Sequence, residues 1–267
     1  MAEAGQLSGR ARPVSSPRRW PSAVTLVRAA IILAVLVIWE SVAASGLLYR
    51  DVVPRLGVIA AAVWKLLSTR DFYWHLWVTG YEIGIGLLIG GASGLLVGLA
   101  LGANRLLARA YEAYLYYLGP TPKIIFFPVM IMWFGVGSGS KIAMGAISCF
   151  FPIALSTAAG MRQIDPVLIR VGRSFRLNTW QMVTKIYLPA MRAPIVNGVR
   201  LGLGVALIGT LLAETKLSNS GIGFLIINAY SLFDMPRMYA MLIVLFVLAI
   251  AANALVGRLG GLHTLRR

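Results

Sequence analysis

Six basic side chains lie in the polar stretch between residues 161 and 193, the longest polar insert between strongly apolar segments. Asp165 followed by Pro166 is typical of a helix start, because the carboxylate caps free N–H groups and proline fits the first turn. At 100° per residue, this helix has apolar and basic side chains on opposite arcs. It could lie on a membrane face and offer one side to a partner. The apolar arc contains Val167, Leu168, Val171 and Phe175, and the basic arc contains Arg170, Arg173 and Arg176.

The second half of this stretch predicts another short helix. Asn178, with Gln181 three residues later, favours a helix start close to a capping box. Leu188-Pro189 is expected to stop the helix. The guanidinium groups of the first helix repel one another unless acidic groups or anionic headgroups face them. Two partners therefore remain open for Arg170 and Arg176: carboxylates of another protein, or lipid headgroups.

Few residues of the chain are suited to catalysis. Its one cysteine, Cys149, permits no intrachain disulfide and no multi-cysteine metal site. The only histidines are His75 and His263, and the nine acidic residues are dispersed. A P-loop needs a Gly-Lys pair to hold phosphates, and none of the five lysines follows a glycine. We therefore expect a chain that is not an enzyme, with no metal site, no cofactor of its own and no ATPase site.

Composition indicates an integral membrane protein. Hydrophobic residues make up 58% of the 267 residues and the mean hydropathy is +0.78. Charged residues make up 13%, about half of the roughly 25% usual in globular proteins. The net charge of +16 could suggest nucleic acid. However, the basic residues stand between apolar spans, where membrane topology demands them, so we expect contact with lipid and none with nucleic acid.

The apolar segments predict an all-α integral membrane protein with six spans and the polar loop 161–193 between spans four and five. A transmembrane region over residues 25–258 lies between a basic, disordered tail at 1–24 and a tail at 259–267. The third span contains Pro120, Pro122 and Pro128, which free backbone carbonyls. The predicted spans are 26–48, 78–101, 111–134, 142–160, 195–213 and 239–255.

The distribution of basic residues predicts the orientation. With six spans, both termini lie on one side of the membrane. Seventeen of the 25 Lys and Arg residues then fall on that side and seven on the other, with Lys123 inside a span. Because cytoplasmic loops are enriched in Lys and Arg, this count places the termini and the loop 161–193 in the cytoplasm.

A glycine occurs every fourth residue along the second span. Such a row leaves a bare backbone ridge that lets another helix approach closely in lipid. We interpret it as a helix-packing face, although glycines facing lipid would show the same spacing. The row consists of Gly86, Gly90, Gly94, Gly98 and Gly102.

The loop resembles the cytoplasmic loop of the permease subunits of bacterial ABC importers, which carries Glu-Ala-Ala, a glycine four residues later, and Ile-x-Leu-Pro. Arg170-Val171-Gly172 stands at the Glu-Ala-Ala position and Arg176 at the glycine, whereas Ile186-Tyr187-Leu188-Pro189 matches in register. The stretches WFGVGSGSK at 133–141 and LAETKLSNSGIGFLI at 212–226 are similar to the nitrate, sulfonate and taurine class. The resemblance covers residues from about 54 to 255.

This resemblance implies a homodimer in the bacterial inner membrane. It also implies two cytoplasmic ATPase subunits, which use ATP and Mg, and a periplasmic solute-binding protein. The cytoplasmic loop would be the coupling helix that docks on the ATPase, and the solute would be a small anion such as a sulfonate, taurine or nitrate. The coupling residues implied in this way are Arg170, Val171, Gly172, Phe175, Arg176, Leu188 and Pro189.

We also expect Trp133, Phe134 and Glu214 to lie near the periplasmic mouth of the translocation path, beside glycine-rich turns. Interfacial anchoring of Trp133 and a solvated Glu214 would explain the same positions. An alternative function is a self-sufficient channel or ion-coupled carrier that uses Glu82, Glu112 or Glu214 as its intramembrane charge. A membrane-embedded enzyme is a third hypothesis, which the absence of clustered His, Cys or paired acids disfavours.

Overall fold

The structure is a computed structural model that describes residues 23–46 and 52–260. The chain forms two compact units, Met1–Leu56 and Gly57–Arg267. In the first unit, the apolar helix α1 (Ala23–Ser45) bonds residues 54–56 through its last turns. The indole Nε1 of Trp39 donates to the carbonyl oxygen of Pro54 at 3.0 Å, and the Glu40 carboxylate accepts from the N–H of Leu56 at 3.0 Å.

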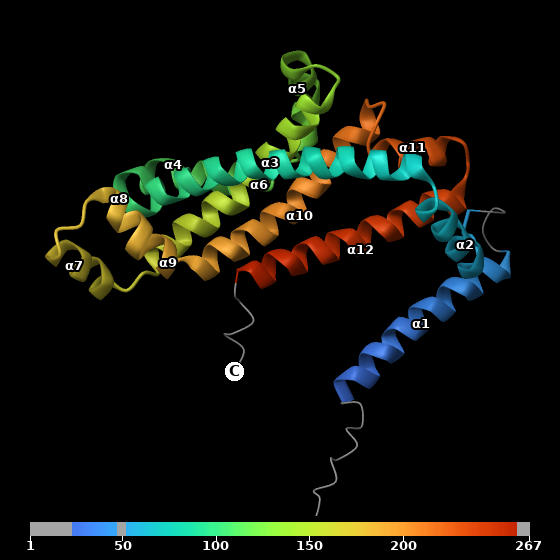
Figure 1. Cartoon of the computed structure of the whole chain (residues 1–267), viewed down its shortest axis with the longest axis horizontal. Helices are drawn as coiled ribbons and strands as arrows, with labels where there is room; N and C mark the ends of the chain where they lie inside the picture. Colours follow the sequence, from blue (N-terminus) through green and yellow to red (C-terminus); the bar gives the residue numbers. More distant parts are fainter. Residues whose placement is uncertain (1–22, 47–51, 261–267) are drawn as a thin grey trace, which may run out of the picture. The chain divides into compact units, whose positions relative to one another are not determined.

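All the regular elements of the described residues are helices (Figure 1). In the second unit, α3 and α10 both pack on α6, the most buried of the long helices. The N-terminal and central helices are α2 (Leu56–Leu67), α3 (Arg70–Ala103), α4 (Arg105–Leu118), η1 (Lys123–Phe126), α5 (Phe127–Phe134) and α6 (Ser138–Arg162). The remaining helices are α7 (Pro166–Ser174), α8 (Thr179–Met182), η2 (Val183–Tyr187), α9 (Leu188–Ala190), α10 (Arg192–Lys216), α11 (Ile222–Ser231) and α12 (Met235–Leu259).

Helix α3 is longer than the span predicted at 78–101. It begins at Arg70, so the aromatic residues Phe72, Tyr73, Trp74 and Trp77 lie in its first turns. It ends at Asn104, whose backbone is extended and whose side chain accepts from the N–H of Leu106 at 2.9 Å. The same asparagine therefore closes α3 and caps the N-terminus of α4, because its short polar side chain satisfies a free helical N–H group.

The predicted third span is a bent pair of helices. Helix α4 and the η1–α5 segment meet at an angle of 93°. Pro120 and Pro122 lie in the four-residue break, where each lacks the N–H that would continue the helix. In Figure 1, α5 rises away from the layer that holds α3, α6 and α10. We call this bend the elbow.

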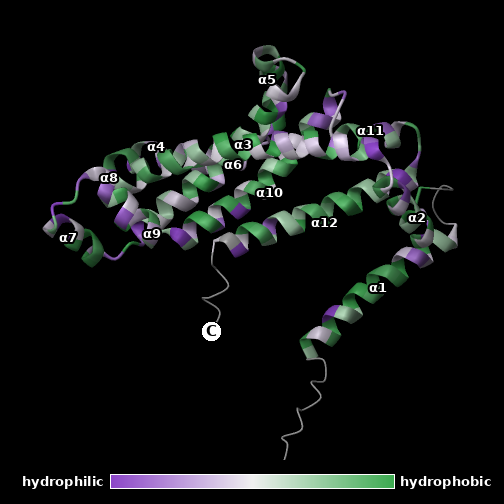
Figure 2. Ribbon diagram, viewed as in Figure 1, coloured by the Kyte–Doolittle hydropathy of each residue, from purple (hydrophilic) through white to green (hydrophobic). Residues whose placement is uncertain are grey.

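Within residues 23–46 and 52–260, five helices are long and apolar enough to cross a membrane, or six if the bent pair forms one span. This confirms the prediction of a helical membrane protein with about six spans. Figure 2 shows that the long helices are mainly hydrophobic, whereas hydrophilic residues gather toward α7, α8 and α9. The predicted tails at 1–24 and 259–267 lie almost entirely outside the described residues.

Candidate functional site

The polar loop begins with the helix that the sequence predicts. The Asp165 carboxylate accepts from the N–H of Val167 at 2.8 Å, and Pro166 is the first residue of α7. The helix has nine residues and ends at Ser174. Arg170 and Arg173 are exposed on it, and so is the apolar arc, with Val171 46% exposed. Both the basic and the apolar arcs are therefore free of contacts that would bury them within the subunit.

Arg176 departs from the predicted position on the basic arc. It lies beyond the end of α7 with a φ of 51°, in the left-handed region. The N–H of Leu177 donates to the carbonyl oxygen of Gly172 at 3.1 Å, and the N–H of Arg176 to that of Arg173 at 2.9 Å. These two bonds form a Schellman motif, which places a left-handed residue just past the helix. Glycine is the usual residue there, so the geometry explains the glycine of the related loop motif.

The contact between the two halves of the loop runs through Gly172. It is the only buried residue of α7. A Cβ added to it would lie 2.5 Å from the Met182 sulfur and would also collide with the side chain of Ile186. A larger residue at this position would require the ends of the Met182 and Ile186 side chains to move.

The second half of the loop confirms one prediction and corrects another. Asn178 and Gln181 form a complete capping box, with bonds of 2.8 and 3.0 Å. However, the sequence predicts that Leu188-Pro189 stops the helix, and the structure shows that it does not. The segment Val183–Tyr187 is a π-helix in which the N–H of Leu188 donates to the carbonyl oxygen of Val183. The wider turn accommodates the proline, and the helical path continues to Ala190.

The row of glycines on α3 lies against α6. Gly86, Gly90, Gly94 and Gly98 are buried. A Cβ at Gly90 would lie 2.5 Å from the Cys149 sulfur, and one at Gly94 would lie 2.8 Å from the carbonyl oxygen of Phe150. At Gly102 an added Cβ would meet the side chain of Met161. The ridge thus faces protein along its whole length, and it joins helices within one subunit.

Glu214 is one of the most buried residues of the described chain, which excludes the solvated position that the sequence left open. It is 1% exposed, in the last turns of α10. Its carboxylate accepts from the Thr79 hydroxyl at 2.7 Å and from the N–H of Gly223 at 2.6 Å. Gly221, with a φ of +100°, brings the turn before α11 so close that a Cβ there would collide with this carboxylate.

Two further side chains, to which the sequence assigned no role, also accept from N–H groups at the start of α11. Together with Glu214 they form what we call the cap of α11. The N–H of Gly221 donates to Nδ1 of His75 at 3.0 Å, and the N–H of Ile222 to the hydroxyl of Thr79 at 2.8 Å. Side chains of α3 and α10 therefore satisfy the first N–H groups of α11. Because Nδ1 accepts, the proton of neutral His75 sits on Nε2, which lies 3.6 Å from Asp71. The sequence signal for this contact is a histidine and a threonine four residues apart, on one face of α3.

Glu82 is completely buried beside this cap. Neither oxygen of its carboxylate has a hydrogen-bond partner among the described residues. Lys141 donates to the carbonyl oxygens of Val136 at 2.9 Å and Gly137 at 3.2 Å, and so holds the glycine-rich turn before α6. Glu214 and Lys141 therefore bond the backbone of two turns, whereas Glu82 bonds none in the described part of the chain.

Trp133 and Phe134 lie at the end of α5, with their rings edge to face at 6.5 Å. They are 72% and 54% exposed. The contacts of Glu214, by contrast, are with α3 and the start of α11. Glu112, the other acidic residue considered for a carrier, forms a two-bond ion pair with Arg162 at 2.7 and 2.8 Å, which ties α4 to α6.

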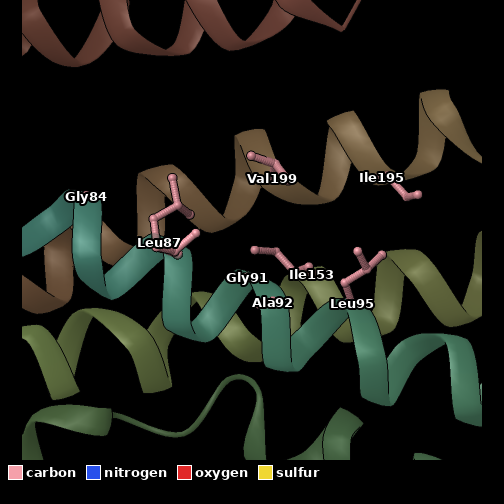
Figure 3. A pocket seen from close by; sticks show the side chains of 9 residues that line it. Gly84, Leu87, Gly91, Ala92, Leu95, Ile153, Ile195 and Val199 are labelled. Carbon is pink, nitrogen blue, oxygen red and sulfur yellow. The ribbon is translucent and has the colours of Figure 1, made fainter. Parts of the chain in front are cut away.

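The long helices also border an apolar pocket of about 390 Å³ (Figure 3). Leu87 and Leu95 of α3, Ile153 of α6, and Ile195 and Val199 of α10 line it. It offers no polar side chain to a charged solute. In the part of the chain that the structure describes, no group of three or more His, Cys, Asp or Glu side chains could hold a metal ion.

Long apolar helices, an exposed amphipathic loop and side-chain-capped turns define a multi-pass helical protein of the membrane. The family model of the binding-protein-dependent transport system inner membrane component matches residues 83–262. The chain belongs to this family, whose members are transport components.

Relatives and a solved structure agree with this assignment. The chain is 30% identical over 222 residues to a Bacillus subtilis protein with the name of an aliphatic sulfonates transport permease, SsuC, covering 83% of this chain and 79% of that one. It is 27% identical over 255 residues to the taurine transport system permease protein TauC of Escherichia coli, covering 92% and 93%. An inward-facing structure of the MetNI methionine ABC transporter shares the fold, with a TM-score of 0.57, 20% identity, and coverage of 77% of this chain and 95% of that one.

Proposed function

We propose that this chain is the permease subunit of an ABC importer for a small anion, such as a sulfonate, taurine or nitrate. Two copies would form the solute path in the bacterial inner membrane. A periplasmic binding protein would deliver the solute and two cytoplasmic ATPase subunits would hydrolyse ATP. Family membership and the relatives named for sulfonates and taurine support this assignment.

The observation that carries the coupling role is the exposed helix α7. Within the subunit, its contact with α8 and η2 runs through Gly172. The apolar arc remains 45–76% exposed beside the exposed Arg170 and Arg173, and it consists of Val167, Leu168, Val171 and Phe175. A rigid, capped helix with both apolar and basic groups uncovered suits insertion into a groove of an ATPase whose rim is acidic. We assign the coupling contact to this helix, with Arg170 and Arg176 facing carboxylates of the partner.

The test of this function is dependence on the partners. Vesicles that contain the permease, its ATPase and its binding protein should accumulate labelled taurine, ethanesulfonate or nitrate only when ATP is present. Omission of the ATPase should stop uptake. Uptake of these anions by the permease alone, driven by an ion gradient, would instead favour the self-sufficient carrier.

The orientation of the loop can be tested separately. In a Cys149→Ser background, single cysteines replace Ser174 in the loop and Ser138 at the start of α6. An impermeant thiol reagent applied to intact cells should label position 138 and leave position 174 unlabelled. Labelling at 174 but not at 138 would reject a cytoplasmic loop.

A further inference from the structure

The elbow between α4 and α5 contains a lysine whose role the coupling loop and the capped turns leave unexplained. Lys123 is the first residue of η1, directly after Pro122. Its ammonium group donates to the carbonyl oxygen of Gly119 and to that of Thr121, the latter at 3.2 Å. It also lies 5.0 Å from the centre of the Phe151 ring. The side chain is half-buried.

The contact with Phe151 locates this charge in depth. Phe151 is near the middle of α6, a 25-residue helix that is long and apolar enough to cross a membrane. With α6 centred in a bilayer, Lys123 would lie near mid-depth. The hydrocarbon core is about 30 Å thick, so phosphate headgroups would be roughly 15 Å away. A lysine at this depth is costly to insert, and such residues mark ion or substrate paths.

No carboxylate of the described residues compensates this charge. The ion pairs there join Arg162 to Glu112 and His75 to Asp71. An ammonium group has three N–H donors, and the two carbonyl oxygens at the elbow occupy two of them. The elbow thus presents an uncompensated cation at mid-depth, on a backbone opened by two prolines.

We propose that Lys123 binds the anionic group of the solute as it crosses the membrane. An oxygen of a sulfonate or nitrate would accept a hydrogen bond from the ammonium group and neutralise its charge. The carbonyl oxygens of Gly119 and Thr121 hold the ammonium group in place between transport cycles. This inference rests on the proposed function and adds a solute-binding residue to it.

Two variants separate the charge of Lys123 from its role in bonding the elbow. Lys123→Gln keeps N–H donors for the carbonyl oxygens but is neutral, and Lys123→Arg keeps the charge. The complex with ATPase and binding protein is reconstituted in vesicles, and uptake of ³⁵S-labelled ethanesulfonate is measured per mole of inserted permease. Loss of a hydrogen bond to a charged group predicts a fall in kcat/KM of about tenfold or more in Lys123→Gln. Lys123→Arg and the exposed control Lys65→Gln should stay within about threefold.

Chemical rescue covers the case in which the glutamine variant inserts poorly. Lys123→Cys is assembled in a Cys149→Ser background and then treated with 2-aminoethyl methanethiosulfonate, which attaches an ammonium group. Uptake should recover after this treatment and stay low after methyl methanethiosulfonate, which adds a neutral group of small size. Equal recovery with both reagents would overturn the proposal, because the charge would then be dispensable.

Two further outcomes separate the role of Lys123 from the importer function. If the unmodified complex imports ethanesulfonate and Lys123→Gln does so equally well, the lysine only supports the elbow and the inference is wrong, while the importer function stands. If the unmodified complex takes up neither ethanesulfonate, taurine nor nitrate, both the anionic substrate class and the role of Lys123 are refuted.

Discussion

Replacing Arg176 by glycine should strengthen the end of α7 even though it removes a charge. Arg176 has a φ of 51° and closes the Schellman motif of this helix. A residue with a Cβ loses roughly 1–2 kcal/mol in the left-handed conformation. Glycine avoids this strain but gives up about 0.5–1 kcal/mol of backbone entropy on folding. The net gain is about 0.5–1 kcal/mol, or a two- to fivefold lower opening constant for the last turn.

Hydrogen exchange of the permease–ATPase complex measures this gain. The N–H groups of Phe175, Arg176 and Leu177 close the motif by donating back to Val171, Arg173 and Gly172. In Arg176→Gly the amides of residues 175–177 should exchange two- to fivefold more slowly, since local opening limits their exchange. Amides in the middle of α6 should not change.

Two further variants separate backbone strain from charge. Arg176→Ala removes the same guanidinium group and keeps the Cβ, so its exchange should match that of the native chain or be faster. Arg176→Asn is neutral but tolerates the left-handed conformation, so it should lie between alanine and glycine. If Arg176→Gly exchanges no more slowly than Arg176→Ala, the backbone conformation stores no strain and the explanation of the glycine position fails.

Three other perturbations have definite expected outcomes. Arg170→Glu should uncouple ATP hydrolysis from uptake without lowering the amount of inserted protein. A carboxylate-to-arginine change in the ATPase groove should then restore uptake. Normal uptake by Arg170→Glu alone would mean that this arginine faces lipid headgroups. Gly94→Leu should lower assembly by overpacking worth about 1–3 kcal/mol or more, whereas Gly204→Leu, where an added Cβ meets nothing within 4 Å, should assemble normally. In Glu214→Gln, one of the two donors would face an amide N–H₂ group, which should lower the free energy of unfolding by about 1–3 kcal/mol. The unfolding temperature in detergent should fall. An unchanged temperature would mean that the cap contributes little.

Local signals in the sequence predict the parts of the fold that depend on neighbouring residues. Asp165-Pro166 starts α7, and Asn178 with Gln181 forms the capping box. Each needs only a side chain and an N–H group two or three residues away. The apolar spans follow equally directly from composition, because a bilayer demands about 20 apolar residues.

Features that depend on tertiary context were not predictable in this way. The prolines of the third span indicate a break, but its angle of 93° cannot be read from them. The π-helix at Val183–Tyr187 lets the chain pass Pro189 without stopping, and no local pattern distinguishes such a turn from a helix end. The cap of α11 joins His75 and Glu214, which are far apart in sequence.

The side chains of the loop 161–193 and those of the stretches 133–141 and 212–226 differ in how far the subunit itself constrains their residue types. Glu214 and Lys141 bond the backbone of turns that meet the long helices, and they are 1% and 2% exposed. Inside a membrane protein, an unsatisfied backbone group costs several kcal/mol, so the residue types in these two stretches are fixed by the subunit itself. Arg170 is exposed on α7 and its side chain serves no such group. Within the subunit, an arginine can therefore occupy the position where the related motif has glutamate without leaving a backbone group unbonded.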